Sequence, residues 1–573
     1  MKLSKRLEQK LKSNDQRDLL IEEYESHFSY QEKKSNLNIS FNRVAFIFFI
    51  FLIISIIFST KAVYLGSLKK KITQNKLIKS EFRSGIVDNN GNIIAKTVIT
   101  NNVGINPNLV IDKKKLLLNL QLIFPKKSKT EFIKIKRKLN KNKFFYIAKK
   151  IDQDQLDELI LLGDKSIITE QKISRIYPHE NLFSHIIGQI DDNNNGISGI
   201  EKSFDKELKK NNLPLRLTVD TDIQYLIREE LKKSGEIFRN LGSAAILMNI
   251  NSGDIISLVS LPDFNLNKRE EISDINFINR ATKGVYEFGS VFKTFTLAAA
   301  FDEKIIEPQT EFADLPKSLT CAGFPIREYD NMIPSNLTAE QILVRSGNIG
   351  SVRIGQKVGE EKFKLFLSKI GVLDEINFDT EEVGKPIKFN WGKCPLATAS
   401  FGHGITTTLL QLAKAYSIVV NGGYQIKPKL IKNNSNEKKE KILSQDLSRE
   451  ILPILRKIVS TKDGTASLAN VNGYEIGGKT GTAEKSADGE YSNKKINSFV
   501  SVFPTSKPKF VLAVMLDEPK INENYIYHYR DGSNIKYKGT PFNTAGWTTV
   551  EATGQIVEKI GPILATKYSE FNF

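Results

Sequence analysis

The chain has 573 residues, of which 83 are Lys or Arg and 65 are Asp or Glu, so its formal net charge is +18. The length predicts several domains, and a composition of 40% hydrophobic and 26% charged residues argues against a disordered or collagen-like chain. Two cysteines and five histidines are too few for a disulfide framework or a cysteine-rich zinc site, so we expect no metal and no cofactor.

The positive charge is spread along the chain. Lysines are densest between Lys126 and Lys150, and neither a zinc-finger spacing nor an RNA-binding aromatic signature accompanies them. Such a run is usually a solvated face, and an anionic polymer or a membrane surface is the next alternative. We therefore expect no nucleic-acid partner.

An uncharged apolar segment, VAFIFFIFLIISIIFST, covers residues 44–60, and further apolar residues follow to Leu65. A helix of this length, at ~1.5 Å per residue, is just long enough to cross a bilayer. A cleaved signal peptide would start within the first few residues, whereas here a charged segment comes first. We predict a cytoplasmic tail at 1–43 and one transmembrane helix at 44–65, with a buried core helix as the alternative.

The charges that flank this segment favour the opposite orientation. More lysines follow the apolar segment than precede it, and the positive-inside rule would then place the C-terminal body in the cytoplasm. Long domains translocate largely regardless of such charges. The flanking residues are Lys33, Lys34 and Arg43 before the segment, and Lys61, Lys69, Lys70, Lys71, Lys76 and Lys79 after it.

Residues 66–215 carry few catalytic candidates. The sequence SGIVDNNGNIIAKT places the turn Asp88–Gly91 between two short apolar runs, which predicts a β-hairpin. A Lys-rich, helix-like stretch continues to about Lys150. His179 and His185 follow in RIYPHENLFSHIIGQI, where we expect a packing or surface role.

Residues 216–573 mix strand and helix signals. Two more hairpins are predicted, from AAILMNI and IISLVSL at 244–261 and from SFVSVF and KFVLAVML at 498–516. Helical stretches lie at 291–301, 409–420 and 548–564. We expect an α+β fold with an antiparallel sheet and helices on its faces.

A first motif combines a serine and a lysine. In Gly289-Ser290-Val291-Phe292-Lys293 the spacing places Ser290 and Lys293 on one face of a helix. A serine at a helix N-terminus meets free backbone N–H groups. A lysine between apolar neighbours loses solvation, which disfavours its charged form and makes it a candidate general base. Alone, this pattern equally fits a helix cap and a solvated lysine.

A second motif, Ser346-Gly347-Asn348, lies further along the chain. A hydroxyl and an amide two positions apart can relay a proton and bind a peptide carbonyl. The same pattern recurs in ordinary turns and caps, which is the alternative interpretation.

A third motif is Gly477-Gly478-Lys479-Thr480-Gly481-Thr482-Ala483. Its glycines predict an edge strand that a substrate backbone can approach, with Lys and Thr side chains free for a carboxylate. A phosphate-binding loop is the rival, because G-x-x-x-x-G-K-[ST] is satisfied from Gly473 to Thr480. That loop requires a helix starting at the Lys-Thr pair, whereas this sequence runs into a turn.

In this order the motifs form the set S-x-x-K, S-x-N, K-T-G of serine acyl-transferases. Longer segments resemble the class B penicillin-binding proteins of the septal, cell-division type. Those segments are NRATKGVYEFGSVFK, SGNIGSVRIG, SFGHGITTTLLQLAKAYSIVVNGG, GGKTGTAEK, SVFPTSKPKFVLAVMLDEP and, nearer the N-terminus, RSGIVDNNGNIIA and RIYPHENLFSHIIGQID. Phe288, Gly347 and Leu409 depart from the family pattern without removing a reacting group.

The resemblance implies a single-pass protein of the bacterial inner membrane. Its N-terminus would be cytoplasmic, a non-catalytic pedestal (dimerisation-type) domain would span 66–215, and a periplasmic, serine β-lactamase-like transpeptidase domain would span 216–573. The implied activity is D,D-transpeptidation of peptidoglycan stem peptides in septal wall synthesis, with β-lactams as inhibitors. Implied partners are a membrane glycosyltransferase and bitopic division proteins.

The resemblance also implies roles for single residues. Ser290 would be the nucleophile, Lys293 its base and Ser346 the proton relay, with Asn348 and Lys479 holding the network. Thr480, Gly481 and Thr482 would bind the substrate, and the backbone N–H groups of Ser290 and Thr482 would form the oxyanion hole. His403 lies in a matching stretch, where packing is favoured over catalysis.

Several alternatives share parts of this pattern. A bifunctional class A protein would need a glycosyltransferase domain in place of the pedestal, and a β-lactamase or carboxypeptidase would deacylate onto water. An elongation-specific class B transpeptidase shares the mechanism, and an inactive division scaffold would need only the anchor and the pedestal. Cys321 and Cys394 are left open between a disulfide and free thiols.

Overall fold

The computed structural model describes residues 36–67, 82–268, 278–433, 439–487 and 490–568. Most of the tail expected at 1–43 therefore lies outside the described residues. The chain divides into two compact units, Met1–Lys79 and Ser80–Phe573.

The described part of the first unit is one long helix, α3 (Asn36–Ser67). Its segment Arg43–Tyr64 has a mean hydropathy of 2.5, and its side chains are exposed throughout. Among the described residues it is the one helix long and apolar enough to cross a membrane, which agrees with the apolar helix predicted at 44–65.

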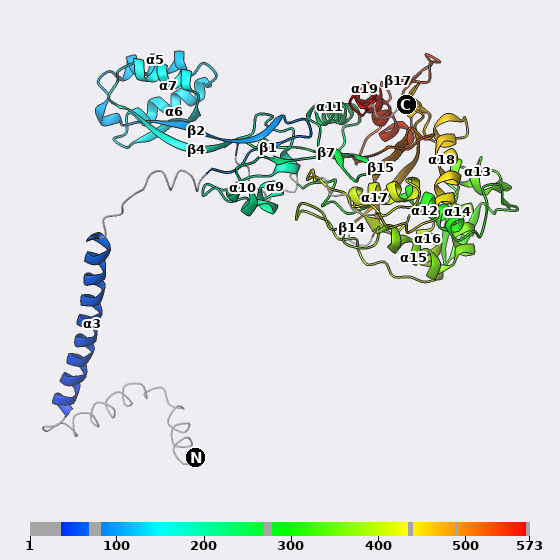
Figure 1. Ribbon diagram of the computed structural model, residues 1–573, viewed down its shortest axis with the longest axis horizontal. Coiled ribbons are helices and arrows are strands. Elements are labelled where there is room, and N and C mark those ends of the chain that lie inside the picture. Colours follow the sequence, from blue (N-terminus) through cyan, green and yellow to red (C-terminus); the bar gives the residue numbers. More distant parts are fainter. Residues whose placement is uncertain (1–35, 68–81, 269–277, 434–438, 488–489, 569–573) are drawn as a thin grey trace, which may run out of the picture. The chain divides into compact units, whose positions relative to one another are not determined.

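The second unit begins with the predicted hairpin. Strand β1 (Ile86–Val87) pairs antiparallel with β2 (Ile93–Ile105), and Ile86 lies opposite Ala95. Strand β2 also pairs with β3 (Phe145–Ile151) and along its length with β4 (Ile167–Ile176), and Figure 1 shows β2 and β4 as a long ribbon. Strand β1 pairs in parallel with β5 (Leu215–Arg216).

Three helices pack at the end of this ribbon around a separate apolar core: α5 (Lys113–Ile123), α6 (Lys129–Leu139) and α7 (Gln153–Leu161). The Lys-rich stretch is helical in α5 and α6, but the expectation of helix as far as Lys150 is wrong, because Phe145–Ile151 is strand β3. Aromatic and β-branched residues favour a strand here, and Phe145 pairs with Ile105 of β2.

The rest of this region carries three short helices, α8 (Ser184–Ile187), α9 (Gly199–Ser203) and α10 (Asp205–Lys210). The expected packing role of the two histidines is confirmed. His185 is half-buried and its ring lies 3.0 Å from the Pro262 carbonyl oxygen, while His179 makes an edge contact with Phe183.

The second half of the unit is built on a five-stranded antiparallel sheet. Its order is β14 (Gly477–Ala487), β15 (Glu490–Phe503), β16 (Phe510–Asp517), β6 (Gly242–Asn249) and β7 (Ile255–Leu261). Both hairpins predicted for this part are present, as β6–β7 and β15–β16. Strand β14, which carries the third motif, lies at one edge.

Helices cover both faces of this sheet. Helices α11 (Thr221–Phe238) and α19 (Thr549–Lys567) pack together on one side, and α17 (Leu409–Val420) lies on the other (Figure 1). A largely helical part adjoins α17 and contains α12 (Lys293–Asp302), α13 (Ala339–Val344), α14 (Asn348–Val358), α15 (Glu360–Ile370), α16 (Lys393–Ala399) and α18 (Gln445–Ser460).

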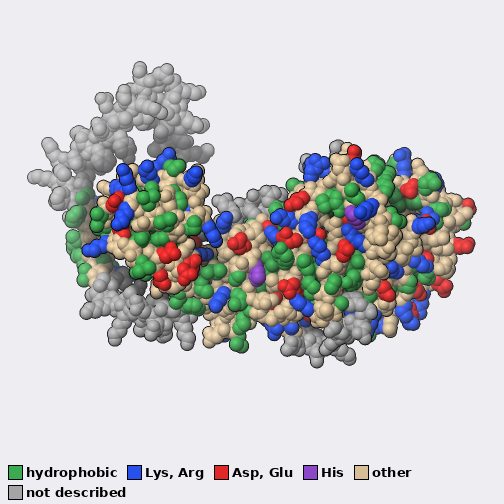
Figure 2. Space-filling model, turned by 90° about the horizontal axis from the view of Figure 1, so that it is seen from above, with side chains coloured by type: hydrophobic (Ala, Val, Ile, Leu, Met, Phe, Trp, Pro, Cys, Tyr) green, Lys and Arg blue, Asp and Glu red, His purple; other side chains and the backbone are tan. Residues whose placement is uncertain are grey.

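Short strand pairs and single 3-10 turns complete the fold. The pairs are β8 (Tyr286–Glu287) with β13 (Thr406–Thr407), β9 (Glu311–Phe312) with β12 (Leu337–Thr338), β10 (Ser318–Cys321) with β11 (Phe324–Arg327), and β17 (Ile526–His528) with β18 (Lys536–Lys538). The 3-10 turns are η1 (Pro107–Leu109), η3 (Gly289–Phe292), η4 (Ser467–Ala469) and η5 (Ala545–Trp547). On the face that Figure 2 shows, basic and acidic side chains are interspersed, which fits a solvated surface.

Candidate active site

Ser290 lies in the one-turn helix η3, directly before α12. The expected helix is present, but its first turn is 3-10, and the Lys293 N–H donates to the Ser290 carbonyl. Gly289 turns the chain into this helix with a φ of +57°, a conformation that glycine adopts without strain. A Cβ atom at Gly289 would lie 2.8 Å from the Thr482 carbonyl oxygen, so glycine also lets strand β14 come close.

A buried tyrosine that the sequence motifs did not identify holds this segment. The Tyr416 hydroxyl donates to the Val291 carbonyl at 2.8 Å and lies 2.9 Å from Thr294 Oγ1. Tyr416 comes from α17, and its side chain is fully buried. Its hydroxyl thus fixes the turn just after Ser290 to the helix beneath it.

Lys293 is buried at the first turn of α12 and points toward the second motif. Its Nζ donates to the Ser346 carbonyl at 2.5 Å and to Asn348 Oδ1 at 2.7 Å, and it lies 3.2 Å from Ser346 Oγ. Burial disfavours the ammonium form and lowers the pKa of Lys293 to about 7, against an opposing effect of Glu328. The expected loss of solvation at this lysine is therefore present.

The second motif joins α13 to α14. Ser346 has a φ of +57°, in the left-handed region, Gly347 caps α14, and Asn348 is its first residue. The Asn348 side-chain amide donates to the Arg327 carbonyl at 2.7 Å while its oxygen accepts from Lys293. This segment is indeed a cap, and it also presents the Ser346 hydroxyl and the Asn348 amide to Lys293.

Lys479 approaches Ser346 from the opposite side. It lies on edge strand β14, its side chain is fully buried, and its Nζ donates to Ser346 Oγ at 2.8 Å. Burial and the neighbouring charge on Lys293 hold the pKa of Lys479 well below its usual value. The Ser346 hydroxyl therefore lies between two buried amines that cannot both stay charged at low cost.

The rest of the third motif borders η3. Thr480 Oγ1 lies 2.7 Å from Thr465 Oγ1, and Thr482 Oγ1 accepts from the Ala545 N–H at 3.0 Å. A Cβ at Gly481 would lie 2.1 Å from the Phe288 carbonyl oxygen, so this glycine is required by packing against the segment before Ser290. The strand runs through Lys479 to Ala487, and a helix does not begin there as a phosphate loop would require.

The structure therefore brings Lys293, Ser346, Asn348 and Lys479 into one hydrogen-bonded network. Ser290 precedes Lys293 by three residues and is partly exposed. Within the described part of the chain its hydroxyl makes no hydrogen bond. A free hydroxyl one turn from an amine with a pKa near 7 suits nucleophilic attack, because the neutral amine can accept the hydroxyl proton.

His403 lies outside this network. Its ring is exposed and stacks on Tyr491, with centroids 4.7 Å apart, and on Phe401 at 5.9 Å. The Tyr491 hydroxyl donates to Glu287, three residues before Ser290. These contacts support the packing role expected for His403.

The two cysteines form a disulfide, with Cα atoms 5.6 Å apart. Sequence left this pairing open because 73 residues separate Cys321 from Cys394. The bond joins strand β10 to helix α16.

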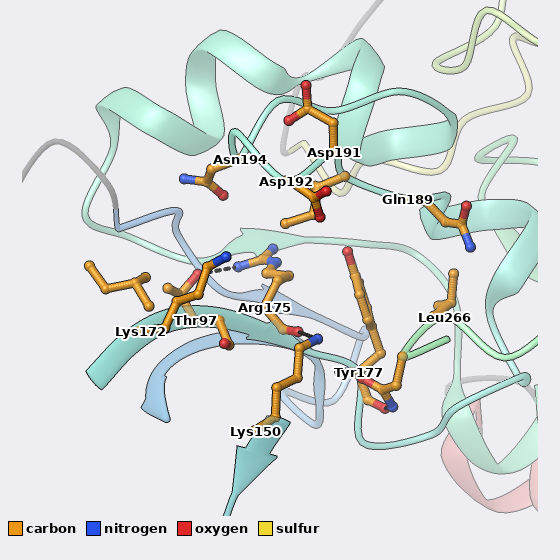
Figure 3. A pocket seen from close by; sticks show the side chains of 14 residues that line it. Thr97, Lys150, Lys172, Arg175, Tyr177, Gln189, Asp191, Asp192, Asn194 and Leu266 are labelled. Carbon is orange, nitrogen blue, oxygen red and sulfur yellow. Dashed lines mark hydrogen bonds between the residues drawn. The ribbon is translucent and has the colours of Figure 1, made fainter. Parts of the chain in front are cut away.

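A pocket of about 150 Å³ lies elsewhere, beside strand β4 (Figure 3). Lys150, Lys172, Arg175, Tyr177 and Asp192 are among its lining residues. None of its lining residues belongs to the three motifs. It is therefore separate from the candidate active site.

Comparisons with known proteins agree with this geometry. Residues 80–235 match the family model described as the penicillin-binding protein dimerisation domain, and residues 243–534 match the penicillin-binding protein transpeptidase domain. A probable peptidoglycan D,D-transpeptidase FtsI of Caulobacter vibrioides is 28% identical, with 85% of this chain and 82% of that protein covered. A peptidoglycan D,D-transpeptidase FtsI of Buchnera aphidicola is 30% identical, with 82% of this chain and 88% of that protein covered.

A solved structure shares the fold. The crystal structure of penicillin-binding protein 3 from Mycobacterium tuberculosis superimposes with a TM-score of 0.63, covering 85% of this chain and 96% of that one at 18% identity. Together with the two family models and the relatives, this confirms the family suggested by the motifs: the chain belongs to the class B penicillin-binding proteins, which join a dimerisation domain to a transpeptidase domain.

Proposed function

We propose that this protein is a peptidoglycan D,D-transpeptidase that cross-links stem peptides in septal wall synthesis through an acyl-enzyme on Ser290. The observation that carries the proposal is the convergence of two buried lysines on Ser346, beside a serine whose hydroxyl is free. The relatives named peptidoglycan D,D-transpeptidase FtsI support the substrate and the septal role.

Acylation begins with proton transfer. Neutral Lys293 accepts the proton of the Ser290 hydroxyl while Oγ attacks the carbonyl carbon of the penultimate D-Ala of a donor stem. The C–N bond then breaks, and a proton returns through Ser346 to the leaving amine of the terminal D-Ala. The product is an ester on Ser290 and free D-Ala, and a general base of this kind contributes ~10²–10⁴-fold to the rate.

Deacylation reverses these roles. The amine of a neighbouring stem attacks the ester carbonyl, loses a proton into the same network and forms the new amide cross-link. The Ser290 oxygen leaves and recovers its proton. A β-lactam enters by the first step, but its ring-opened amine stays attached, so the acyl-enzyme persists.

Strand β14 supplies the binding side of the site. We assign the substrate carboxylate to Thr480 and Thr482, with Gly481 keeping the strand close to η3. The backbone N–H groups of Ser290 and Thr482 form the oxyanion hole, where each such donor contributes ~3–4 kcal/mol in related acyl transfer. Asn348 holds the Lys293 amine, and Lys479 holds the Ser346 hydroxyl.

The same proposal places the protein in the bacterial inner membrane, with residues 1–43 cytoplasmic, 44–65 in the bilayer, the pedestal at 66–215 and the transpeptidase domain at 216–573 in the periplasm. Helix α3 supports the anchor. The Cys321–Cys394 disulfide supports an oxidising compartment for the body, because disulfides rarely persist in the cytosol. Its partners would be a membrane glycosyltransferase and bitopic division proteins.

The experiment is intact-mass analysis of the full chain in detergent after exposure to a penicillin, beside Ser290→Ala. We expect one adduct per chain, mapped to Ser290 by peptide digestion and absent in the variant. A folded wild-type protein without an adduct would contradict the proposal and favour an inactive scaffold.

A further inference from the structure

The segment Arg327–Tyr329, at the end of hairpin β10–β11, contacts the second motif on both of its sides. The Glu328 carboxylate accepts the Asn348 N–H at 2.6 Å and the Ile349 N–H at 2.9 Å. The Arg327 carbonyl accepts the Asn348 side-chain amide at 2.7 Å. The Tyr329 hydroxyl donates to the Arg345 carbonyl at 3.0 Å, on the other side of Ser346.

We propose that this segment is the positioning element of the catalytic centre, that Glu328 is its positioning residue, and that the Cys321–Cys394 disulfide anchors it. The inference rests on the proposed function, since it assigns how Ser346 and Asn348 are held for Lys293. Sequence motifs do not reveal it, because Glu328 lies 18 residues before Ser346, outside all three motifs.

The backbone of the second motif needs such a support. Ser346 adopts a left-handed conformation, which is unfavourable for a residue that carries a Cβ atom. The first N–H groups of α14 also lack partners inside the helix. Glu328 satisfies two of them with a carboxylate, which is the charge favoured at a helix N-terminus.

Glu328 also acts on the charge of Lys293. It raises the pKa of Lys293 against the larger lowering by burial. Within the described residues, Lys479 of β14 also faces Lys293, whose charge lowers the pKa of Lys479.

Two ion pairs involve charged residues on the other helices packed against α12, and neither pair includes Lys293. Glu340 of α13 pairs with Lys457 of α18, and Lys362 of α15 pairs with Glu303. A variant that loses only the Glu328 charge should therefore change the protonation of Lys293, beyond any loosening of structure.

The disulfide explains how the small hairpin β10–β11 can hold the second motif in position. Strands β10 and β11 form an isolated two-stranded sheet, and such a hairpin is marginally stable on its own. Cys321 lies at the turn end of β10, opposite Phe324. Its partner Cys394 lies on α16, which packs against α14. The covalent bond thus ties the hairpin to a neighbour of the helix that it caps.

The first test measures the rate of acylation by a fluorescent penicillin against pH for the full chain in detergent. We expect Glu328→Gln to slow acylation about tenfold, in line with the cost of small misplacements. Because Lys293 must be neutral to act, losing the Glu328 charge should also move the acidic limb of the profile to lower pH.

The matched control is Asp330→Asn, which removes the same charge two residues away. Within the described residues that carboxylate accepts one hydrogen bond, from the Met332 N–H in its own turn. It should match wild type, and Glu328→Asp should recover part of the rate. An unmoved acidic limb in Glu328→Gln, with wild type acylated normally, overturns the role of Glu328. A wild type that is not acylated refutes the proposed function instead.

The second test uses Cys321→Ser with Cys394→Ser. We expect acylation to slow about as much as in Glu328→Gln, and mild reduction of wild type to have the same effect. Circular dichroism reports whether the double variant is folded. A folded double variant acylated at the wild-type rate overturns the anchoring role.

Discussion

Two buried polar networks in the second unit differ in the group that lies between their two basic side chains. In the pedestal, Glu201 is fully buried between two arginines, accepting from Arg83 Nε at 2.9 Å and from Arg175 Nε at 2.7 Å. In the candidate active site, Lys293 and Lys479 are equally buried, and a serine hydroxyl lies between them instead of a carboxylate.

The difference explains why one network holds the fold and the other suits chemistry. Arginine stays protonated in proteins, and a carboxylate between two arginines offsets their loss of hydration. A lysine without a carboxylate in contact gives up its proton instead, and the pKa of Lys293 falls to about 7. Buried positive charge is thus structural where it is paired and reactive where it is not.

The sharpest test of this contrast is Lys293→Met. Acylation by penicillin should fall by ~10²–10⁴-fold, because the general base is lost. The free energy of unfolding should not fall. Between pH 7 and the ordinary lysine pKa the unfolded chain binds a proton that the folded chain does not, so burying Lys293 costs stability there. Chemical denaturation at pH 8 checks this, and a marked loss of stability would contradict it.

The converse test is Glu201→Gln. It leaves two buried arginines without their shared carboxylate, and breaking a buried ion pair costs ~3–5 kcal/mol. Denaturation curves should show this loss, while the acylation rate per folded molecule should match wild type. Glu229→Gln, at a partly exposed ion pair with Arg228, is the control and should change stability by less than ~1 kcal/mol. Equal losses of stability in Glu201→Gln and Glu229→Gln would contradict the structural role of the buried ion pairs.

The pH dependence of acylation tests whether Lys293 is the reactive base of the active site. Since the reactive form of Lys293 is neutral, the rate should be high above pH 7 and fall as pH drops through about 7. Below that pH the loss should approach tenfold per unit, as for a single titrating base. Rapid-quench acylation from pH 5.5 to 9 measures it. A flat profile over this range would exclude a lysine with this pKa as the base.

The sequence predicts the β-hairpins of the fold well, because alternating hydrophobic residues mark their strands. Those at 84–97, 244–261 and 498–516 are all present. It misplaces the strand Phe145–Ile151, where lysines in the same segment mask the aromatic and β-branched pattern, and where pairing with β2 decides the outcome.

The site was predictable as motifs but not as a network. Spacing places Ser290 and Lys293 together because both lie on one helical element. Spacing does not show that Lys479 and Lys293 converge on Ser346, since three separate elements must pack first. Tyr416 and Glu328 carry no motif at all, and only their contacts with η3 and α14 show what they do.

Tyr416 gives the smallest expected effect. Tyr416→Phe removes the hydroxyl that donates to the Val291 carbonyl, which also accepts the Lys293 N–H, so the expected loss is that of one hydrogen bond, ~0.5–1.5 kcal/mol. Because the lost bond fixes the turn just after Ser290, acylation should also slow several-fold, while the acidic limb stays in place since no charge is lost. Thermal unfolding measures the stability, and the pH profile of acylation measures the rate. The control is Tyr225→Phe, on the exposed face of α11. If Tyr416→Phe lowers stability but leaves acylation at the control rate, Tyr416 supports the fold without positioning Ser290.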